Sequence, residues 1–164
     1  MFNFNTYFKN IAISLKEQLH TESNIHFNRI SSITELEEFI ANSRKLSGYQ
    51  MLILDKDNGK LDDSSLSDNL IDRHFHSFFI LKKAASGDFS EIEKTKSGCK
   101  IIAKKIMSKM FKDKRECTNG LKDLQRSTFT YSSIGPLTHG YWGIMVNFTA
   151  YENANIIYET LDWI

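Results

Sequence analysis

The sequence predicts an α+β fold, with a mostly antiparallel or mixed sheet of four to five strands and helices packed mainly on one face. Three observations carry this prediction. Apolar side chains recur every three or four residues at 4–20 and 89–114, as on one face of a helix. They alternate strictly over 141–151, as in a strand with one buried face. Short turns join consecutive predicted strands, which favours antiparallel neighbours.

The first half of the chain is predicted to alternate helices and strands. After the first helix, a short strand at 24–30 leads to a second helix. That helix begins at the capping-box sequence S-I-T-E, which starts at Ser32, and it ends near Asn42. The nearly continuous apolar run at 49–55 predicts a central strand. The polar residues 56–70 then form either a loop or the tip of an extended hairpin.

The second half is predicted to contain the longest elements. A strand at 71–83 carries aromatic side chains on both faces, which indicates a central position. A turn leads into the helix at 89–114, which ends at Thr118-Asn-Gly, and strands follow at 129–133 and 141–151. The core side of the long helix is predicted to consist of Ile92, Cys99, Ile102, Ala103, Ile106 and Met110.

Length and composition favour a single domain over 1–164 in a reducing compartment. The chain has 164 residues, of which 41% are hydrophobic and 25% charged, the usual balance for a globular protein. Its two cysteines, Cys99 and Cys117, have no metal-ligand spacing and are expected to be free thiols. The first residues lack the basic leader of a secretory signal, and no apolar run is long enough to span a membrane. We therefore expect no membrane partner and a cytoplasmic location.

Charge is distributed unevenly along the chain. Residues 94–115 contain nine basic side chains and one acid, whereas residues 55–72 contain six Asp and two Lys. Such polarity suits contact with nucleic acid or between copies of the same chain. The apolar tail at 152–164 is a candidate docking segment, in cis or in trans. The candidate interaction residues are Lys105, Lys109, Lys112, Asp57, Asp62, Asp63 and Trp163.

The residues do not indicate catalysis, so we expect neither enzymatic activity nor a cofactor. The sequence D-K-D-N-G at 55–59 begins like a calcium loop, but its glycine is fifth instead of sixth and Leu66 stands at the twelfth position in place of Glu. His74 and His76 have a spacing that can bind zinc, without a nearby second ligand pair. No nucleophile motif or phosphate-binding glycine loop is present in the sequence.

Four features together resemble the small tail-terminator and head–tail joining (minor tail) proteins of tailed bacteriophages and prophages. They are the amphipathic helix from Phe4 to Leu19, the strands at 49–55 and 73–83 with a long polar excursion between them, the single long helix at 89–114, and the aromatic final strand Y-W-G-I-M-V-N-F. The resemblance implies an α/β domain that assembles into a ring, often a hexamer, at the end of the tail tube. Such proteins stop tube polymerisation, offer a joining surface to the head, and perform no catalysis.

This resemblance leads to a set of expectations. The acidic loop and basic helix of neighbouring copies would meet head to tail around a ring. The partners would be further copies of the chain and tail-tube or head-connector proteins, first in the host cytoplasm and then in the virion. Two alternatives remain open. One is a nucleic-acid-associated protein that uses the lysine-rich helix at 94–115 without base specificity, and the other is a small metal-dependent protein around His74 and His76.

Overall fold

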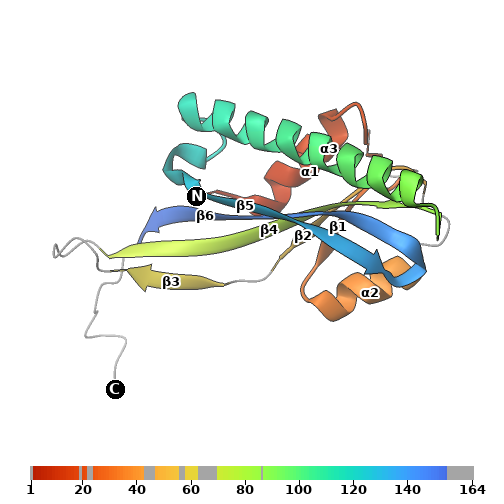
Figure 1. Cartoon of the computed structure of the whole chain (residues 1–164). Coiled ribbons are helices and arrows are strands. Elements are labelled where there is room, and N and C mark those ends of the chain that lie inside the picture. The colour runs from red at the N-terminus through yellow and green to blue at the C-terminus, as the bar shows by residue number, and fades with distance from the viewer. Residues whose placement is uncertain are drawn as a thin grey trace, which may run out of the picture.

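The computed structural model describes residues 2–18, 20–21, 24–42, 47–55, 58–62, 70–85 and 87–154. They form three α-helices and a six-stranded mixed sheet (Figure 1). The predicted α+β class is confirmed, but the predicted strand number of four to five is too low. The elements in chain order are α1 (Phe4–Ser14), β1 (Phe27–Ile30), α2 (Ile33–Asn42), β2 (Gln50–Leu54), β3 (Gly59–Asp62), β4 (Ile71–Lys83), α3 (Phe89–Arg115), the 3-10 turn η1 (Leu121–Asp123), β5 (Leu124–Leu137), the 3-10 turn η2 (Thr138–Gly140) and β6 (Tyr141–Asn153).

The sheet is organised around the pair β4 and β6. These strands run antiparallel in continuous register from Ile71 opposite Asn153 to Lys83 opposite Tyr141. The strand order is β1-β2-β4-β6-β5, with β3 paired to β4 on the same side as β2. Only β1 and β2 run parallel among these pairs, so the sheet is mixed. The central positions predicted for the strands at 49–55 and 71–83, now β2 and β4, are thereby confirmed, whereas the central position of β6 was not predicted.

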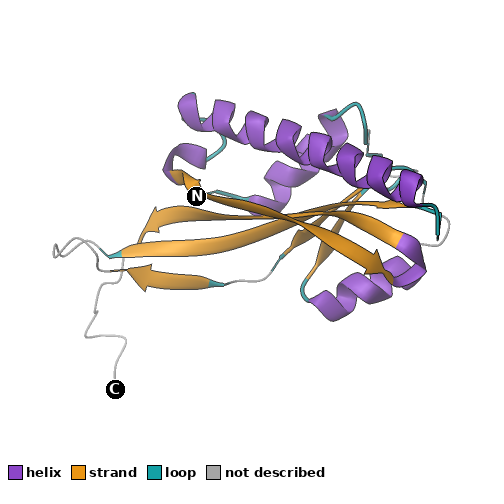
Figure 2. Cartoon of the chain, in the orientation of Figure 1, coloured by secondary structure: helices purple, strands orange, loops and turns teal. Residues whose placement is uncertain are grey.

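Helices cover both faces of the sheet (Figure 2). Helices α1 and α3 lie on one face, where Phe78 and Ile80 of β4 join the larger hydrophobic cluster. Helix α2 lies on the other face, where Phe79 and Leu81 join a smaller cluster. All six residues predicted for the core side of α3 are buried. Alternation along β4 therefore supplies both clusters, as its aromatic residues predicted.

Three predicted boundaries are wrong. Helix α1 ends at Ser14, six residues early, and the Ser14 hydroxyl there donates back to the Asn10 carbonyl at 2.9 Å. The polar excursion contains a strand, because β3 pairs with the start of β4, which selects the hairpin alternative for these residues. Strand β5 is also longer than the predicted 129–133: it spans Leu124–Leu137 at a sheet edge, and its added residues mix polar side chains with Leu124, Ile134 and Leu137, so no apolar period marks them.

The helix N-termini follow the predicted capping chemistry. The Glu35 amide donates to the Ser32 hydroxyl at 3.1 Å, which confirms the capping box at α2. The Glu35 carboxylate, however, accepts from the Ser31 amide at 2.6 Å, one residue before the expected partner. In α3 the Asp88 carboxylate accepts from the Glu91 amide at 2.9 Å. Both helices thus begin with a satisfied backbone donor.

A buried carboxylate joins the C-terminal turn of α3 to α1. Asp113 is 1% exposed and accepts hydrogen bonds from the Tyr7 hydroxyl at 2.8 Å, the Lys109 ammonium at 2.7 Å and the Asn119 amide at 3.3 Å. Burial alone would raise the pKa of Asp113, but the hydrogen bonds from Lys109 and Tyr7 outweigh it and lower that pKa. Asp113 therefore stays ionised and holds α1 against α3.

The two cysteines are expected to differ sharply in reactivity. Cys99 is 0% exposed, and burial raises the pKa of its thiol to about 12, whereas Cys117 is exposed. Because the thiolate is the reactive form, a disulfide reagent such as dithiobis(nitrobenzoate) should modify one thiol rapidly in the native protein and the second only after unfolding. The variant Cys117→Ser should lose the rapid phase. Two rapid thiols in the native protein would contradict the burial of Cys99.

Candidate functional site

The three lysines predicted to meet a partner form ion pairs within the chain. The Lys105 ammonium contacts the carboxylate of Glu17, in the segment after α1, and Lys109 contacts the buried Asp113. Lys112 lies 3.8 Å from Glu116, one turn further along. All three remain about half exposed, so these pairs contribute little to stability, except where Asp113 is buried. This side of α3 is therefore partly neutralised.

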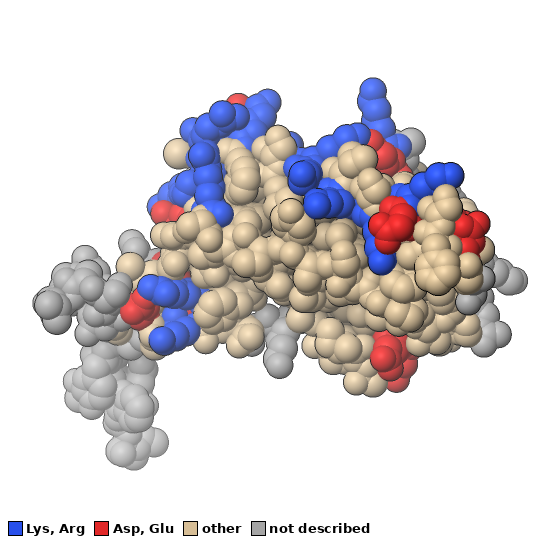
Figure 3. Space-filling model, viewed as in Figure 1, with Lys and Arg blue, Asp and Glu red and all other residues tan. Residues whose placement is uncertain are grey.

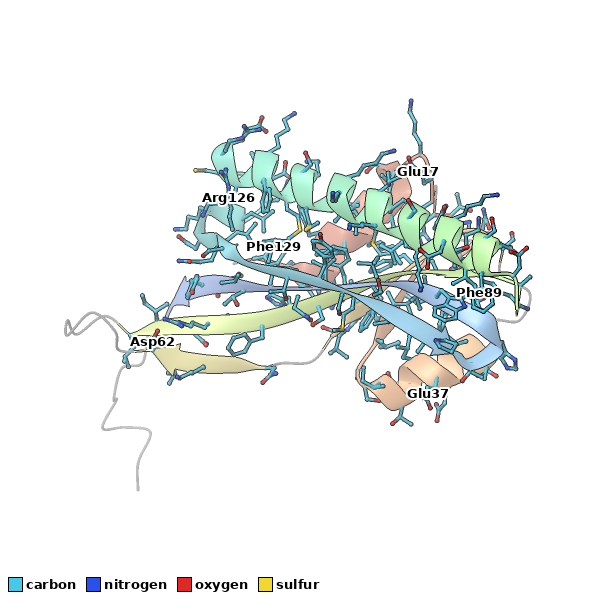
Figure 4. All side chains as sticks on the ribbon, viewed as in Figure 1. Glu17, Glu37, Asp62, Phe89, Arg126 and Phe129 are labelled. Carbon is cyan, nitrogen blue, oxygen red and sulfur yellow. The ribbon has the colours of Figure 1, made fainter. Side chains whose placement is uncertain are left out.

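The predicted acidic residues are only partly described. Asp62 ends β3 and forms an ion pair with Arg73 on the neighbouring strand β4. Figure 4 shows it at the end of the sheet away from α2. Asp57, Asp63 and Trp163 lie outside the described residues, as does most of the tail at 152–164.

The strongest candidate for an interaction site is the free edge of the sheet at β5. In the sheet as described, β5 pairs only with β6. Every residue of β5 after Leu124 is exposed or half-exposed, and the sequence from Ser127 to Leu137 contains no charged side chain. Natural edge strands are usually protected by charge or by covering elements. Strand β5 has two breaks in its register with β6 and a proline at 136, which also protect an edge, so its uninterrupted and uncharged run 130–134 is the part suited to pairing with another strand.

Cations from α3 and β5 lie over aromatic rings along this edge. The Lys96 ammonium is 4.7 Å from the centroid of the Trp142 ring, and the Lys100 ammonium is 5.1 Å from that of Tyr131. The Arg126 guanidinium carbon is 5.5 Å from the centroid of Phe111. Such pairs fall within the usual cation–π distance of about 6 Å. We call Lys96, Lys100, Phe111, Arg126, Phe129, Tyr131 and Trp142 the β5 edge surface.

The pictures show how this surface is arranged. In Figure 3, Lys and Arg side chains gather along α3, above an uncharged band that follows β5. Figure 4 places Arg126 and Phe129 on β5, below the C-terminal half of α3. Tyr131 is 49% exposed and stands within the band. The surface therefore combines free backbone groups, flat aromatic rings and positive charge.

Aromatic stacking anchors the β5 edge surface to the core. Phe129 stacks on the buried Phe148 with ring centroids 5.0 Å apart and planes 10° from parallel. The Phe129 ring also makes a T-shaped contact with the ring of Phe111 in α3, with the two ring centroids 5.0 Å apart. The sheet edge and helix are thus held in fixed positions, and a docking partner would meet a preformed surface.

The β5 edge surface was missed in the sequence because its members lie on three separate elements. The prediction instead chose Lys105, Lys109 and Lys112, which share one solvent face of the long helix. Lys96 and Lys100 have the i, i+4 spacing of neighbours on one helix face and border the core position Cys99. Two features of the sequence could have identified this surface. One is the pair of lysines beside a core position of the helix, and the other is the presence of Tyr131 and Trp142 in the predicted strands.

The histidine pair does not form a metal site with its described neighbours. His74 Nε2 lies 3.3 Å from the Asp72 carboxylate. His76 instead packs among aromatic rings, with its centroid 4.5 Å from that of Phe4 and 5.3 Å from that of Phe148. Across the described residues, no group of three His, Cys, Asp or Glu side chains is placed to hold a metal ion. A metal-dependent function around His74 thus gains no geometric support.

Comparisons with protein-family models, with curated proteins and with solved structures find no match to this chain. In the described part of the chain, no helix has both the length and the apolar character needed to cross a membrane. The functional assignment therefore depends on the surface itself. The β5 edge surface has the chemistry to bind an extended peptide segment. Strand β5 offers backbone hydrogen bonds, the aromatic rings offer apolar contact, and the cations attract acidic side chains.

Proposed function

We propose that the protein is a non-enzymatic assembly component of a phage or prophage particle, a tail terminator or head–tail joining adaptor that forms a ring. The observation that carries this proposal is the β5 edge surface, where the uncharged run 127–137 of an edge strand lies beside the exposed Lys100 and the half-buried Lys96, which also pairs with Glu93. Each copy would receive an acidic, extended segment of the next copy on this surface. The ring would then present its remaining faces to the tail tube and the head connector.

The sheet topology supports a head-to-tail contact between copies. Strand β3 runs antiparallel to β4, while β5 runs antiparallel to β6 and hence in the same direction as β4. Strands β3 and β5 of one chain therefore point in opposite directions. A sheet continued from β5 of one copy to β3 of the next, with both copies in the same orientation, forms an antiparallel pair. Such a heterologous contact closes into a ring by rotation.

Charge also supports this pairing. In the sequence, β3 is followed by Asp63 and Asp68, and only Lys60 is basic in 59–72 before Arg73. At the opposite edge, β5 lies beside Lys96 and Lys100, and Lys100 is exposed. Opposite charges on the two edges favour contact between different edges over contact between identical ones, so they select the head-to-tail arrangement.

A lysine placed in the middle of the β5 edge should disrupt self-association. Ser132 is exposed on β5 opposite Met145 of β6, and a charge there opposes strand addition, as in natural protected edges. We expect Ser132→Lys to weaken association at least about tenfold, which corresponds to about 1.4 kcal/mol. The measurement is the solution mass by light scattering over a concentration series, at low and physiological salt.

The control is Ser108→Lys, which adds the same charge at an exposed position of α3 away from β5. Charge reversal gives a second arm: Lys100→Glu should weaken association, and adding Asp63→Lys in the same chain should restore it. The proposal is wrong if wild type stays monomeric throughout, or if both lysine variants associate equally.

The cation–aromatic pairs favour one competing function, binding of single-stranded nucleic acid. Aromatic rings stack on bases, and cations neutralise phosphates. This function predicts that the protein binds an unstructured oligonucleotide with an affinity that falls steeply as salt rises. Lys100→Glu would weaken that binding, and Asp63→Lys would not specifically restore it. The same two variants therefore distinguish the two functions.

A further inference from the structure

A second candidate site lies beside β1, at the opposite end of the strand order from the β5 edge surface. A pocket of about 430 Å³ opens between α1 and β1. Its walls include Asn5, Thr6 and Lys9 from α1, His20 from the connecting segment, and Asn28 and Arg29 from β1. None of its lining residues is acidic, and two carry a permanent positive charge. The pocket therefore favours a negatively charged ligand.

Asp55 holds one cation and one amide of the pocket lining in place. The Asp55 carboxylate accepts a hydrogen bond from the Asn5 amide at 3.1 Å and forms an ion pair with Arg29. Burial alone would raise the pKa of Asp55, but these hydrogen bonds outweigh it and lower that pKa, so Asp55 stays ionised. Arg29 keeps a 58% exposed side chain and has further N–H donors beyond the one that contacts Asp55.

His20 contributes a donor instead of an acceptor. Its Nδ1 atom accepts hydrogen bonds from the backbone amides of His26 at 3.1 Å and Phe27 at 3.3 Å. Burial, followed by the charges of Lys9 and His26, lowers the pKa of His20, so the ring is neutral near pH 7. The single ring proton of that neutral form must then lie on Nε2. The lining is thus rich in N–H donors.

Two lining side chains also carry polar atoms without partners. Among the described residues, Asn28 Nδ2 and Asn5 Oδ1 are enclosed by protein and make no hydrogen bond. An unmet buried polar group costs roughly 1–3 kcal/mol, and native proteins keep few of them. Both side chains line the pocket, but the two atoms are enclosed, so each would reach a ligand only after its amide rotates. For Asn5 that rotation would exchange the hydrogen bond to Asp55 for one to the ligand. A bound ligand would supply one acceptor to Asn28 and one donor to Asn5.

We propose that this pocket binds the phosphate group of a small hydroxylated phosphate monoester. Residues that carry N–H donors line the pocket from α1, the connection and β1, and the three oxygens of a phosphate monoester can accept from several directions at once. The volume exceeds that of a phosphate ion alone, which leaves room for the carrying group. The orphaned Asn5 oxygen matches a hydroxyl of that group.

The test is titration of the folded protein with glycerol 3-phosphate, inorganic phosphate and succinate, followed by calorimetry and by amide chemical shifts. We expect saturable binding of glycerol 3-phosphate, tighter than that of the other two, with shifts centred on α1 and β1. Lys9→Ala and Asn28→Ala should each weaken it about tenfold, or about 1.4 kcal/mol. Lys16→Ala and Lys104→Ala, both exposed lysines outside the pocket lining, should leave it unchanged.

Three results would overturn the proposal. The first is absence of saturable binding of glycerol 3-phosphate in a protein shown to be folded by circular dichroism. The second is equal loss of binding in Lys104→Ala, with shifts spread along α3, which would indicate general attraction to the lysines of that helix. The third is equal affinity for inorganic phosphate or succinate, which would remove the monoester assignment. None of these results depends on self-association.

Discussion

Gly143→Ala is expected to cause the largest loss of stability of any single methyl group added to this chain. Gly143 lies in β6 opposite Leu81 of β4 and is buried. A Cβ atom there would lie 2.0 Å from the Ile80 carbonyl oxygen, which belongs to the backbone of the central strand pair. Since that oxygen cannot move without separating β4 from β6, we expect a loss of about 4 kcal/mol or more, measured by urea denaturation.

Gly98→Ala is the matched control for this prediction. A Cβ atom at Gly98 would lie 2.1 Å from the Tyr49 hydroxyl, which is the end of a rotatable side chain. Tyr49 can move away, and alanine in a helix interior gains roughly 1 kcal/mol over glycine. We therefore expect Gly98→Ala to unfold within about 1 kcal/mol of wild type. Similar midpoints for the two variants would show that β6 is not packed against β4 as described.

Removal of the buried carboxylate of Asp113 should give the second large effect. The variant Asp113→Ala leaves the Tyr7 hydroxyl and the Asn119 amide without their partner, while Lys109 can return to solvent. We expect a loss of about 3 kcal/mol, or roughly 10 °C in the thermal midpoint. Tyr7→Phe alone should cost about 1 kcal/mol. The double variant should be less destabilised than the sum of the two, because both remove the same bond.

The contribution of Asp113 should also depend on pH. Its folded-state pKa lies below its ordinary value, so the ionised carboxylate stabilises the fold fully above the unfolded pKa of about 3.9. This stabilisation should shrink as the pH falls below that value, and the wild type and Asp113→Ala should converge. The control is Asp123→Ala, an exposed carboxylate 3.7 Å from Lys122, which should change stability by less than about 0.5 kcal/mol. A difference between wild type and Asp113→Ala that stays constant down to pH 2 would contradict an ionised Asp113.

The sequence was most informative where burial makes apolar side chains recur at a fixed interval along the chain. Residues such as Phe78 and Phe79 of β4 face opposite clusters, and their alternation was sufficient to predict a central strand. It was least informative at the sheet edges. Strand β3 and residues 125–128 of β5 are mostly polar and exposed, so no apolar period distinguishes them from a loop. Their strand structure comes from pairing with β4 and β6, which is a tertiary effect.

The candidate site was predicted less well than the fold. Net charge along 94–115 correctly identified a basic helix, but not the partners of each lysine. Lys105 meets Glu17 across a large sequence separation, and Asp113, the single acid in this stretch, is buried instead of solvated. The cation–aromatic pairs Lys96–Trp142 and Lys100–Tyr131 likewise join residues that only the folded chain brings together. The spacing of residues within one helix or strand does not predict contacts between different elements.

The position of β6 has a consequence for the order of folding during synthesis. Strand β6 is the last described element of the chain, yet it fills the centre of the sheet between β4 and β5. Until it leaves the ribosome, β4 has an unpaired inner edge, and Phe78 and Phe79 have their cross-strand neighbours on β2 but not those on β6. Closing the β4–β6 pair also requires contacts such as Ser77–Asn147, which lie 70 residues apart. Long-range pairing of this kind is slow and leaves apolar surface exposed in the meantime. We therefore expect the nascent chain to keep the apolar inner edge of β4 exposed, and open to chaperone binding, until its final strand is inserted.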